Sequence, residues 1–557
     1  MERILANTEQ LESEVYKKRK NVLSWLSLFH KFGWSREFAQ ERKFIINKIR
    51  EKTGYSEDDI ETVIQELKDR KVLQGDKTLY VSPRLLHVQA WVWWWGKYGG
   101  SFDMAEMRQS TFEGEIIKMS DSLHDWFIQM FEYAREVEGA SEVVRKLLAV
   151  DGSLSNETEL IEALSGNFFL SLTKADPESA LLILENWFEK KTDDELRAYR
   201  QNRMTLVRVL EIMAVWGSLF TRAAELMLRL AVTEEDHTYS NNSEGTFADL
   251  FSNGWGKLAP TEAAPSERFP IMEKAVKSSD DRERLMGLNA ISHALEASHF
   301  TRIVGAEVQG LREEPKLWSP ETYREIYDAI RAAWLLLLEV LPSLDQELKD
   351  EAIKIINNHI RGLLAINEDA LLYLGEYAEL VKEDFIPKGD AVDSINIIRR
   401  YDTKRRPLKV IKAIQELSDY LEGSDFTSRL KRYIAYNSME DWWGDDEDIV
   451  KSSSKVAVLV RETMANPELL DENTWLFTKE AKNGYRFGQG LAEIDEKHTL
   501  LNKLVNLQKT SDRVSEDEAS LIFLSGYLCK LQKLNFLKWQ DRKSTSELQS
   551  LVIISYA

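Results

Sequence analysis

Apolar residues recur at the three- and four-residue spacing of helices along most of this 557-residue chain, and alternating apolar and polar runs are scarce. Asp176-Pro177, a favourable cap and first-turn pair, precedes one such apolar face. That face comprises Ala180, Leu181, Leu184, Trp187 and Phe188. Two further faces flank Gly217-Ser218 and predict two helices joined by a very short turn. They are Leu206, Val207, Leu210, Met213 and Ala214, then Ala223, Leu226, Met227, Leu230 and Ala231. More helices are predicted at 320–341, 346–364, 367–382, 406–422 and 425–436.

Helices of this length joined by short turns are typical of an α-solenoid of the HEAT or TPR kind. We therefore expect a mainly all-α protein with an α-solenoid-like array of helical repeats over 99–400. Residues 401–557 would be its C-terminal repeat region. No crisp repeat period is visible, which leaves the repeat class open and keeps an irregular helical domain as the alternative. The apolar end at 551–557 either packs on the last helix or marks an array that is cut short.

The chain before residue 99 follows the plan of a winged helix-turn-helix. Apolar spacing predicts helices at 21–32 and 38–52, and Gly54 suits a left-handed cap after the second. After a third helix, a Gly-Asp-Lys turn within 72–81 predicts a short hairpin, the wing. We place this domain at 21–98, after a helical lead-in at 1–20. Its tryptophan-rich stretch at 91–95 is interpreted as a hydrophobic joint to the repeats, with a ligand-stacking platform as the alternative.

The third helix of this module is acidic where DNA would be read. Ser56 and Asp59 have capping-box spacing, and the buried stripe is Ile60, Val63, Ile64 and Leu67. Its first turns also carry Glu57, Asp58 and Glu61. DNA affinity depends on Lys and Arg that neutralise phosphates, so these carboxylates favour a protein-contacting module over a DNA reader. The candidate nucleic-acid backbone contacts, which could equally be a solvated face, are Arg70, Lys71, Lys77 and Arg84.

Charge and composition limit the setting. Acidic residues outnumber basic ones by 93 to 73, which gives a net charge of −20 and argues against a surface that binds nucleic acid throughout. A single cysteine, Cys529, excludes an internal disulfide framework. The N-terminus has no apolar signal core, and the longest apolar run, at 332–338, is about a third of the roughly 20 residues that a membrane span needs. We expect a cytoplasmic protein without a membrane anchor.

No pattern of catalytic residues stands out. The sequence lacks a GxxxxGK[ST] phosphate loop, metal-ligand spacing of His and Cys, and a nucleophile elbow, so we predict no cofactor and no enzyme activity. One basic cluster before Pro407 is a candidate phosphate or anion contact, although cations at a helix C-terminus are favoured by the dipole alone. Its arginines are Arg399, Arg400, Arg405 and Arg406. The acidic, aromatic stretch at 440–448 is interpreted as a solvated loop rather than a grip on a cationic partner.

Several segments resemble the C-terminal region of STAND-type P-loop NTPases, in which an NTPase domain is followed by a winged helix and a helical-repeat sensor. The likeness is found in four segments: the winged-helix stretch, 223–251, 475–495 and 523–528. Within 223–251 the matching residues are Asn241, Asn242, Gly245, Thr246, Phe247, Leu250 and Phe251. Asn241 and Asn242 are interpreted as turn-formers, with a ligand role as the second choice. The resemblance implies an NTPase domain before residue 20, which this chain does not carry.

The leading hypothesis is therefore a non-enzymatic regulatory or recognition protein. Its helical repeats would bind a protein partner, and its winged helix would couple them to an NTPase domain. The resemblance implies antiviral defence or signalling as the setting. The alternative is a DNA-binding winged-helix transcription regulator with a helical effector domain, and an enzyme with an unrecognised site is third.

Overall fold

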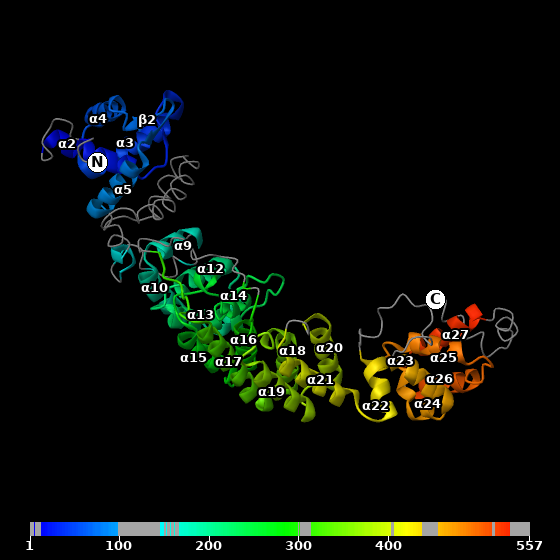
Figure 1. Ribbon diagram of the computed structural model, residues 1–557. Helices are drawn as coiled ribbons and strands as arrows, with labels where there is room; N and C mark the ends of the chain where they lie inside the picture. The colour runs from blue at the N-terminus through cyan, green and yellow to red at the C-terminus, as the bar shows by residue number, and fades with distance from the viewer. Residues whose placement is uncertain are drawn as a thin grey trace. The chain divides into compact units, whose positions relative to one another are not determined.

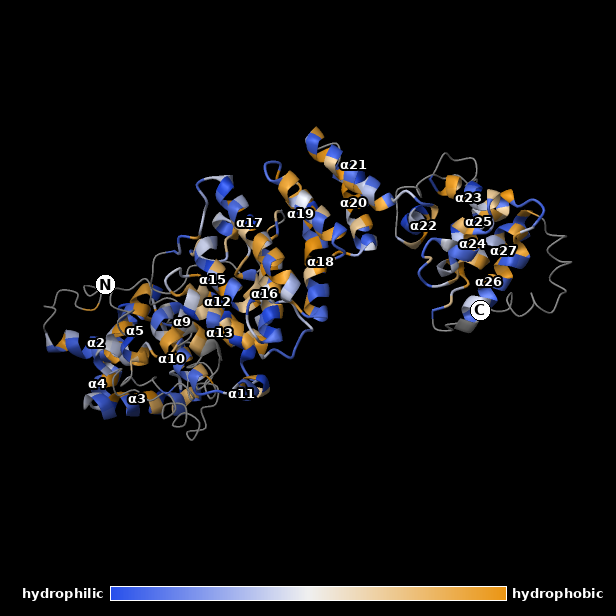
Figure 2. Ribbon diagram, turned by 90° about the horizontal axis from the view of Figure 1, so that it is seen from below, coloured by the Kyte–Doolittle hydropathy of each residue, from blue (hydrophilic) through white to orange (hydrophobic). Residues whose placement is uncertain are grey.

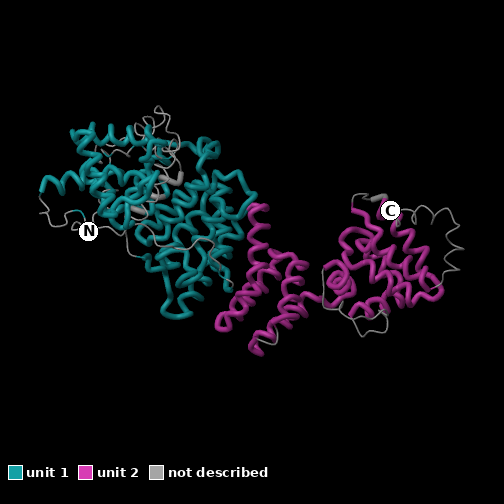
Figure 3. Tube along the Cα trace, turned by 90° about the horizontal axis from the view of Figure 1, so that it is seen from above, with its two compact units in different colours: residues 1–344 teal, residues 345–557 magenta. Residues whose placement is uncertain are grey.

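The computed structural model describes residues 13–98, 145–149, 166–298, 314–402, 406–436, 455–514 and 518–534, with a few isolated positions such as Leu5. Across them the chain is mostly helical, which confirms the prediction of a mainly helical protein. The chain divides into two compact units, 1–344 and 345–557 (Figure 3). The finer domain boundaries stay predictions. The stretches 440–448 and 551–557 lie outside the described residues.

The N-terminal module of unit 1 combines four helices with a small sheet (Figure 1). Its elements are α2 (Glu14–Leu26), β1 (Phe32–Gly33), α3 (Ala39–Thr53), α4 (Glu57–Asp69), β2 (Leu73–Gln74), β3 (Thr78–Val81) and α5 (Arg84–Tyr98). The three strands are antiparallel in the order β1-β3-β2. A short 3-10 turn, η1 (Arg36–Phe38), leads into α3.

The helix predicted at 21–32 is wrong at both ends. The helix begins at Glu14, capped by the Ser13 hydroxyl, and ends at Leu26. Phe32 continues the apolar period, but its backbone pairs with Leu79 in the sheet. An apolar residue at helical spacing can therefore belong to a strand, because the pattern of buried residues alone does not distinguish the two structures.

The third helix is formed as its sequence predicts. The Ser56 hydroxyl accepts a hydrogen bond from the Asp59 N–H, and the Asp59 carboxylate accepts one from the Ser56 N–H, which completes the capping box. The predicted stripe of α4 is buried, and Gly54 ends α3 with a φ of 74°. Left-handed backbone of this kind favours glycine, since it has no Cβ to clash.

Helix α5 packs against α2 through aromatic side chains. The centre of the Trp94 ring lies 5.2 Å from that of Trp25 and 4.9 Å from that of Trp95. Both pairs are edge-to-face, a geometry that suits the quadrupoles of the rings. The His87 Nε2 atom lies 3.0 Å from the Ser27 carbonyl oxygen, just beyond the end of α2. Tryptophans of the 91–95 stretch thus fill the core of this module, and their role as a joint to the repeats stays a prediction.

The remainder of unit 1 is a succession of helices. They are α9 (Gly166–Ala175), α10 (Pro177–Glu189), α11 (Asp193–Ala198), α12 (Arg203–Ala214), α13 (Phe220–Val232), α14 (Ser243–Asp249), α15 (Pro265–Val276), α16 (Asp281–Ala294) and α17 (Tyr323–Val340), with the short turns η4 (Gly256–Leu258) and η5 (Leu341–Ser343). Neighbours in sequence pack together, as α12 does with α13 and α15 with α16. The Asp176 carboxylate caps α10, and the predicted faces of α10 and α12 are buried. On α13, Leu226 is only half-buried, while the other four predicted residues are buried.

Unit 2 continues with helices of similar length. They are α18 (Gln346–Leu363), α19 (Ala370–Lys382), α20 (Lys388–Asp402), α21 (Leu408–Glu422), α22 (Phe426–Leu430), α23 (Lys455–Ala465), α24 (Leu469–Glu472), α25 (Gly484–Ile494), α26 (Leu501–Val514) and α27 (Ile522–Leu534). A π turn, η7 (Lys431–Ala435), extends α22, and a 3-10 turn, η10 (Thr474–Phe477), precedes α25. In both units hydrophobic residues follow one side of the helices and hydrophilic residues the other (Figure 2).

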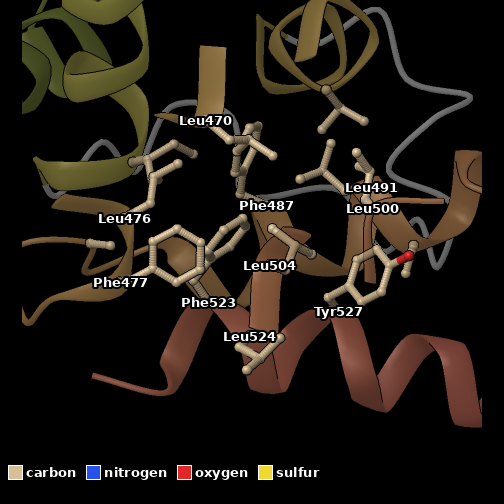
Figure 4. Close-up of a cluster of buried hydrophobic side chains, with 14 of the residues drawn as sticks. Leu470, Leu476, Phe477, Phe487, Leu491, Leu500, Leu504, Phe523, Leu524 and Tyr527 are labelled. Atoms are coloured by element: carbon tan, nitrogen blue, oxygen red, sulfur yellow. The ribbon is translucent and has the colours of Figure 1, made fainter. Parts of the chain in front are cut away.

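The C-terminal core is built around Phe523. Its ring lies 5.2 Å from that of Phe477 and 5.7 Å from that of Phe487 (Figure 4). Beside it, α25 and α27 pack backbone to backbone. A Cβ atom on Gly526 would collide with the Tyr485 carbonyl oxygen, and one on Gly488 with the Phe523 carbonyl oxygen. These two glycines permit a close helix crossing.

Candidate functional sites

The exposed ridge of α4 is anionic. Asp58, Thr62, Gln65 and Asp69 follow one another at helical spacing on the exposed side of the helix, and all are solvent-exposed. The Gln65 amide donates to the Asp69 carboxylate at 2.8 Å. Over its whole described length this ridge carries no cation. If the module is a winged helix, as the sequence predicts, this ridge is the surface that would face a DNA duplex.

Three other carboxylates of α4 pair with cations from α2 and α3. Asp59 pairs with Lys18 at 2.9 Å, Glu66 pairs with the buried Arg19 at 2.6 Å, and Glu61 pairs with Arg42. The hydrogen bond from Lys18, with those from Ser56, lowers the pKa of Asp59. The acidic turn is therefore partly structural, since these carboxylates hold α4 against the other two helices. Sequence spacing does not predict these ion pairs, because Lys18 is 41 residues from Asp59 and Arg19 is 47 residues from Glu66.

The four candidate contacts near the wing are placed differently from one another. Lys77 pairs with both carboxylate oxygens of Glu37 at 2.9 Å, and the Arg70 guanidinium donates to the Leu5 carbonyl oxygen at 3.2 Å. Lys71 is exposed with a φ of 58°, and Arg84 is exposed at the start of α5. Lys77 and Arg70 are thus engaged within the module.

The basic cluster before Pro407 contains its own counter-ion. Arg361 donates to both carboxylate oxygens of Asp402, at 2.7 and 3.2 Å, and this contact lowers the pKa of Asp402. Arg406 lies 3.5 Å from the same carboxylate and donates to the Arg361 carbonyl oxygen at 3.1 Å. Burial lowers the pKa of Arg406. Its position is that of a structural cation.

The remaining arginines of this cluster do not share that arrangement. Arg399 donates to the Ser418 hydroxyl at 3.0 Å, and the Arg400 guanidinium lies 5.2 Å from the centre of the Tyr401 ring. Arg405 lies outside the described residues.

The prediction of a loop over 241–247 is wrong beyond Asn242, because α14 begins at Ser243. The side chain of Asn242 is structural. Its carboxamide oxygen accepts from the Gly245 N–H at 2.9 Å and caps α14, while its amide donates to the Asp236 carbonyl oxygen at 2.9 Å. Asn241 is exposed. Thr246 and Phe247 are buried on α14. A Cβ on Gly245 would collide with the carbonyl oxygen of Ser240, so glycine is required there.

A buried ion pair lies behind this loop. The Glu234 carboxylate lies 3.2 Å from Arg203 and accepts from the Ser243 hydroxyl at 2.7 Å. Burial would raise the pKa of Glu234, but the Ser243 hydrogen bond and the charge of Arg203 outweigh it, so its pKa is lowered. These contacts tie α12 and α13 to α14, which explains why the segment needs polar residues that are not part of an open site.

The sequence reasoning missed one site. Within unit 1, a cavity of about 450 Å³ lies among residues of 251–272, α16 and α17. Its apolar lining comprises Phe251, Ala264, Pro265, Phe269, Met272, Ala294, Trp318, Ala329 and Ala332. Its polar lining comprises Asn253, Ser266, Arg268, Glu325 and Asp328. An apolar cavity with a few polar groups is the usual form of a small-molecule site.

Arg268 is the unusual member of this lining, since only 1% of it is exposed. Its Nη1 atom donates to the carbonyl oxygens of Leu250 and Ser252, both at 2.8 Å. Among the residues that the structure describes, its Nε and Nη2 atoms have no hydrogen-bond partner. Burial lowers the pKa of Arg268 to about 9, which leaves it cationic at neutral pH. The sequence signal was an arginine in register with the buried Ile271, Met272 and Ala275.

The two carboxylates of the lining are already engaged. Glu325 accepts from the backbone N–H of Thr322 at 3.1 Å, at the start of α17. Asp328 pairs with Arg324 at 2.7 Å. Both residues are exposed, so they contribute negative charge near solvent without reaching Arg268 by any hydrogen bond or ion pair within the described residues.

Within the described part of the chain, no cluster of three or more His, Cys, Asp or Glu side chains is arranged to hold a metal ion. The helices that are described include none with the length and apolarity needed to cross a membrane. Comparison with protein-family models, with curated proteins and with solved structures finds no match to this chain.

Proposed function

We propose that this chain is a non-enzymatic recognition protein whose N-terminal module is a winged helix that docks on a basic protein surface. The observation that carries the proposal is the exposed ridge of α4, where Asp58 and Asp69 stand at the positions that would face a duplex. The element order from α2 to β3 and the strand order β1-β3-β2 support the winged-helix interpretation.

Electrostatics favours a protein over DNA as the partner of this ridge. DNA affinity comes largely from Lys and Arg that neutralise phosphates, and an anionic ridge adds repulsion instead. On the wing, Lys77 is already neutralised by Glu37. A basic protein surface, in contrast, gains attraction and a faster encounter from the same charges.

The partner that we propose is an NTPase domain of the STAND type. In this proposal the helices after α5 form HEAT- or TPR-like repeats that recognise a protein, and the winged helix relays that event to the NTPase in a defence or signalling pathway of the cytoplasm. The support is the resemblance at 223–251, 475–495 and 523–528, together with the caps and close helix crossings found there.

DNA binding is tested by fluorescence anisotropy with a labelled duplex, at about 50 and 200 mM salt. The wild-type chain should show no salt-dependent binding. Asp58→Lys combined with Asp69→Lys should create it, since both changes place cations on the ridge. Wild-type binding that weakens with salt and disappears in the Lys71→Gln, Lys77→Gln variant would instead identify a DNA regulator.

The partner is sought in the genomic sequence immediately upstream, as an open frame that carries GxxxxGK[ST]. Its purified product should co-elute with this chain in size-exclusion chromatography and hydrolyse ATP only when it is present. The Asp58→Lys, Asp69→Lys variant should lose co-elution, whereas Glu347→Lys, on α18, is the matched control. ATP hydrolysis by this chain alone would contradict the proposal.

A further inference from the structure

Asn253 gives the cavity in unit 1 a fixed hydrogen-bond acceptor. The residue lines the cavity and is 2% exposed, and its Nδ2 atom donates to the Ala294 carbonyl oxygen at 2.7 Å, which holds the plane of the amide. Among the described residues nothing donates to its Oδ1 atom, which nevertheless keeps some accessible surface. Because Asn253 is otherwise buried, that surface belongs to the cavity. Such an acceptor favours a ligand that carries an N–H or O–H group.

Two carboxylates of α17 add further acceptors to the lining. Glu325 and Asp328 are three residues apart on the helix, so they lie on the same side of it, and both are exposed. The hydrogen bonds that Glu325 accepts from Thr322 and Glu321 all end on Oε1, and Arg324 contacts Asp328 through Oδ1. Within the described part of the chain, the second oxygen of each carboxylate has no hydrogen-bond or ion-pair partner.

Arg268 does not offer a ligand the opposite chemistry. Its Nη1 atom is occupied by the Leu250 and Ser252 carbonyl oxygens, and its Nε and Nη2 atoms each expose less than 1 Å². An anionic ligand would therefore find no guanidinium edge and would be repelled by Glu325 and Asp328. Two carboxylates against one guanidinium leave the lining with a formal charge of −1, which favours a cation.

The remaining lining specifies the body of the ligand. Phe251, Phe269 and Trp318 offer aromatic contact, and a cavity of about 450 Å³ accommodates a small organic molecule. Aromatic faces also attract an organic cation. A primary amine has a pKa near that of lysine, about 10, so it carries the required charge at neutral pH.

We propose that this cavity binds a small aryl-alkyl amine, whose ammonium group is held by Glu325 and Asp328 and whose ring system carries a donor for Asn253 Oδ1. The proposal goes beyond the proposed function and does not depend on it, because α4 contributes no residue to the cavity.

Isothermal titration calorimetry on the full chain tests the proposal with indole probes of similar size. Tryptamine, a cation, should bind about fivefold or more tightly than the neutral alcohol tryptophol, and the anion indole-3-propanoate should bind more weakly than either. Raising the salt from about 50 to 200 mM should weaken tryptamine and leave tryptophol unchanged. 1-Methyltryptamine lacks the ring N–H, so it should bind about fivefold more weakly than tryptamine.

A charge-removing variant tests the carboxylates. Glu325→Gln combined with Asp328→Asn keeps the size and the hydrogen-bonding oxygens of both side chains. It should lower the affinity for tryptamine to that for tryptophol, while tryptophol itself binds as before, a result that damage to the fold would not give. Glu347→Gln combined with Asp350→Asn removes two exposed carboxylates at the same spacing on α18 and should bind both probes as the wild type does.

A filling variant places the binding at this cavity. Ala329→Phe occupies part of the space and leaves Asn253 and both carboxylates intact, so it should abolish binding of tryptamine and tryptophol in a protein that still unfolds cooperatively. Ala378→Phe, at a half-buried position of α19, is its size-matched control and should bind as the wild type does.

Four results would overturn the proposal. The first is equal affinity for tryptamine and tryptophol, since the carboxylates would then have no role. The second is equal affinity for tryptamine and 1-methyltryptamine, which would remove Asn253 from the site. The third is unchanged affinity in a folded Ala329→Phe variant, which would place the ligand elsewhere. The fourth is that none of the probes binds at millimolar concentration.

Discussion

Buried His87 makes the N-terminal module sensitive to mild acid. The side chain is 2% exposed, and burial lowers its pKa to about 3 from the usual 6.5, an effect that the contact with the Ser27 carbonyl oxygen only partly offsets. In the unfolded chain the imidazole takes up a proton below about pH 6.5, whereas in the folded module it does not. The contribution of neutral His87 to the stability of the module is therefore fully present above about pH 6.5. It is lost progressively as the pH falls towards 3.

The magnitude follows from the two pKa values. At pH 5 the unfolded imidazole, with its pKa of 6.5, is stabilised by RT ln(1 + 10^1.5), about 2 kcal/mol, and at pH 7 by only about 0.2 kcal/mol. The free energy of opening of the module should therefore fall by about 1.9 kcal/mol between pH 7 and pH 5, which is roughly a 25-fold rise in the opening equilibrium constant. Nearby His30 has a lowered pKa too, but it is exposed and contributes much less.

Hydrogen exchange measured by mass spectrometry gives the required free energy on the full chain. The opening free energy of peptides from α2 and α5 is measured at pH 7, 6 and 5, after correction for intrinsic exchange rates. His87→Gln keeps a side-chain N–H donor for the Ser27 carbonyl but cannot titrate, so most of the pH dependence should disappear. His293→Gln, at a partly exposed site that pairs with Asp249, should leave it unchanged.

A pH dependence in His87→Gln equal to that of the wild-type chain would refute this reasoning. So would a wild-type module whose opening free energy is the same at pH 5 and pH 7. Either result would mean that the imidazole is hydrated or protonated in the folded module, and that α5 does not seal it from water.

Two further substitutions test the packing described above. Gly526→Ala should destabilise the C-terminal core by more than about 2 kcal/mol, since its Cβ would meet the Tyr485 carbonyl oxygen, whereas Gly375→Ala on α19 meets nothing within 4 Å and should be neutral or stabilising. Urea unfolding separates the two outcomes, and equal midpoints would contradict the close crossing. Asn242→Ala should cost about 1 kcal/mol through the lost cap of α14, while exposed Asn241→Ala should stay within about 0.5 kcal/mol. Equal losses in the two variants would show that the cap is not what stabilises the loop.

The sequence predicted helices well where periodicity and caps agree. Asp176 and Ser56 begin α10 and α4 as expected, because a cap is local and its partner lies three residues away. The end of α2 at Leu26 was not predicted, because Phe32 is held in a strand by pairing with Leu79, 47 residues along the chain. Strand pairing of that range leaves no local signal.

The same distinction governs the candidate sites. Exposed cations such as Lys77 looked available because Glu37 is 40 residues away in sequence. Arg268 is the reverse case, because its place among apolar residues of α15 was visible, while the carbonyl oxygens of Leu250 and Ser252 and the empty space beside it depend on how separate helices meet.

The contact between α25 and α27 also constrains how this region can vary between species. Gly526 meets the backbone of Tyr485, and Gly488 meets the backbone of Phe523, so each helix supplies the small residue that the other requires. A larger side chain at either position would move the two helices apart and relieve the demand for glycine at the other. The two positions should therefore change together in related sequences, and a lineage that has lost one glycine should tolerate the loss of the second.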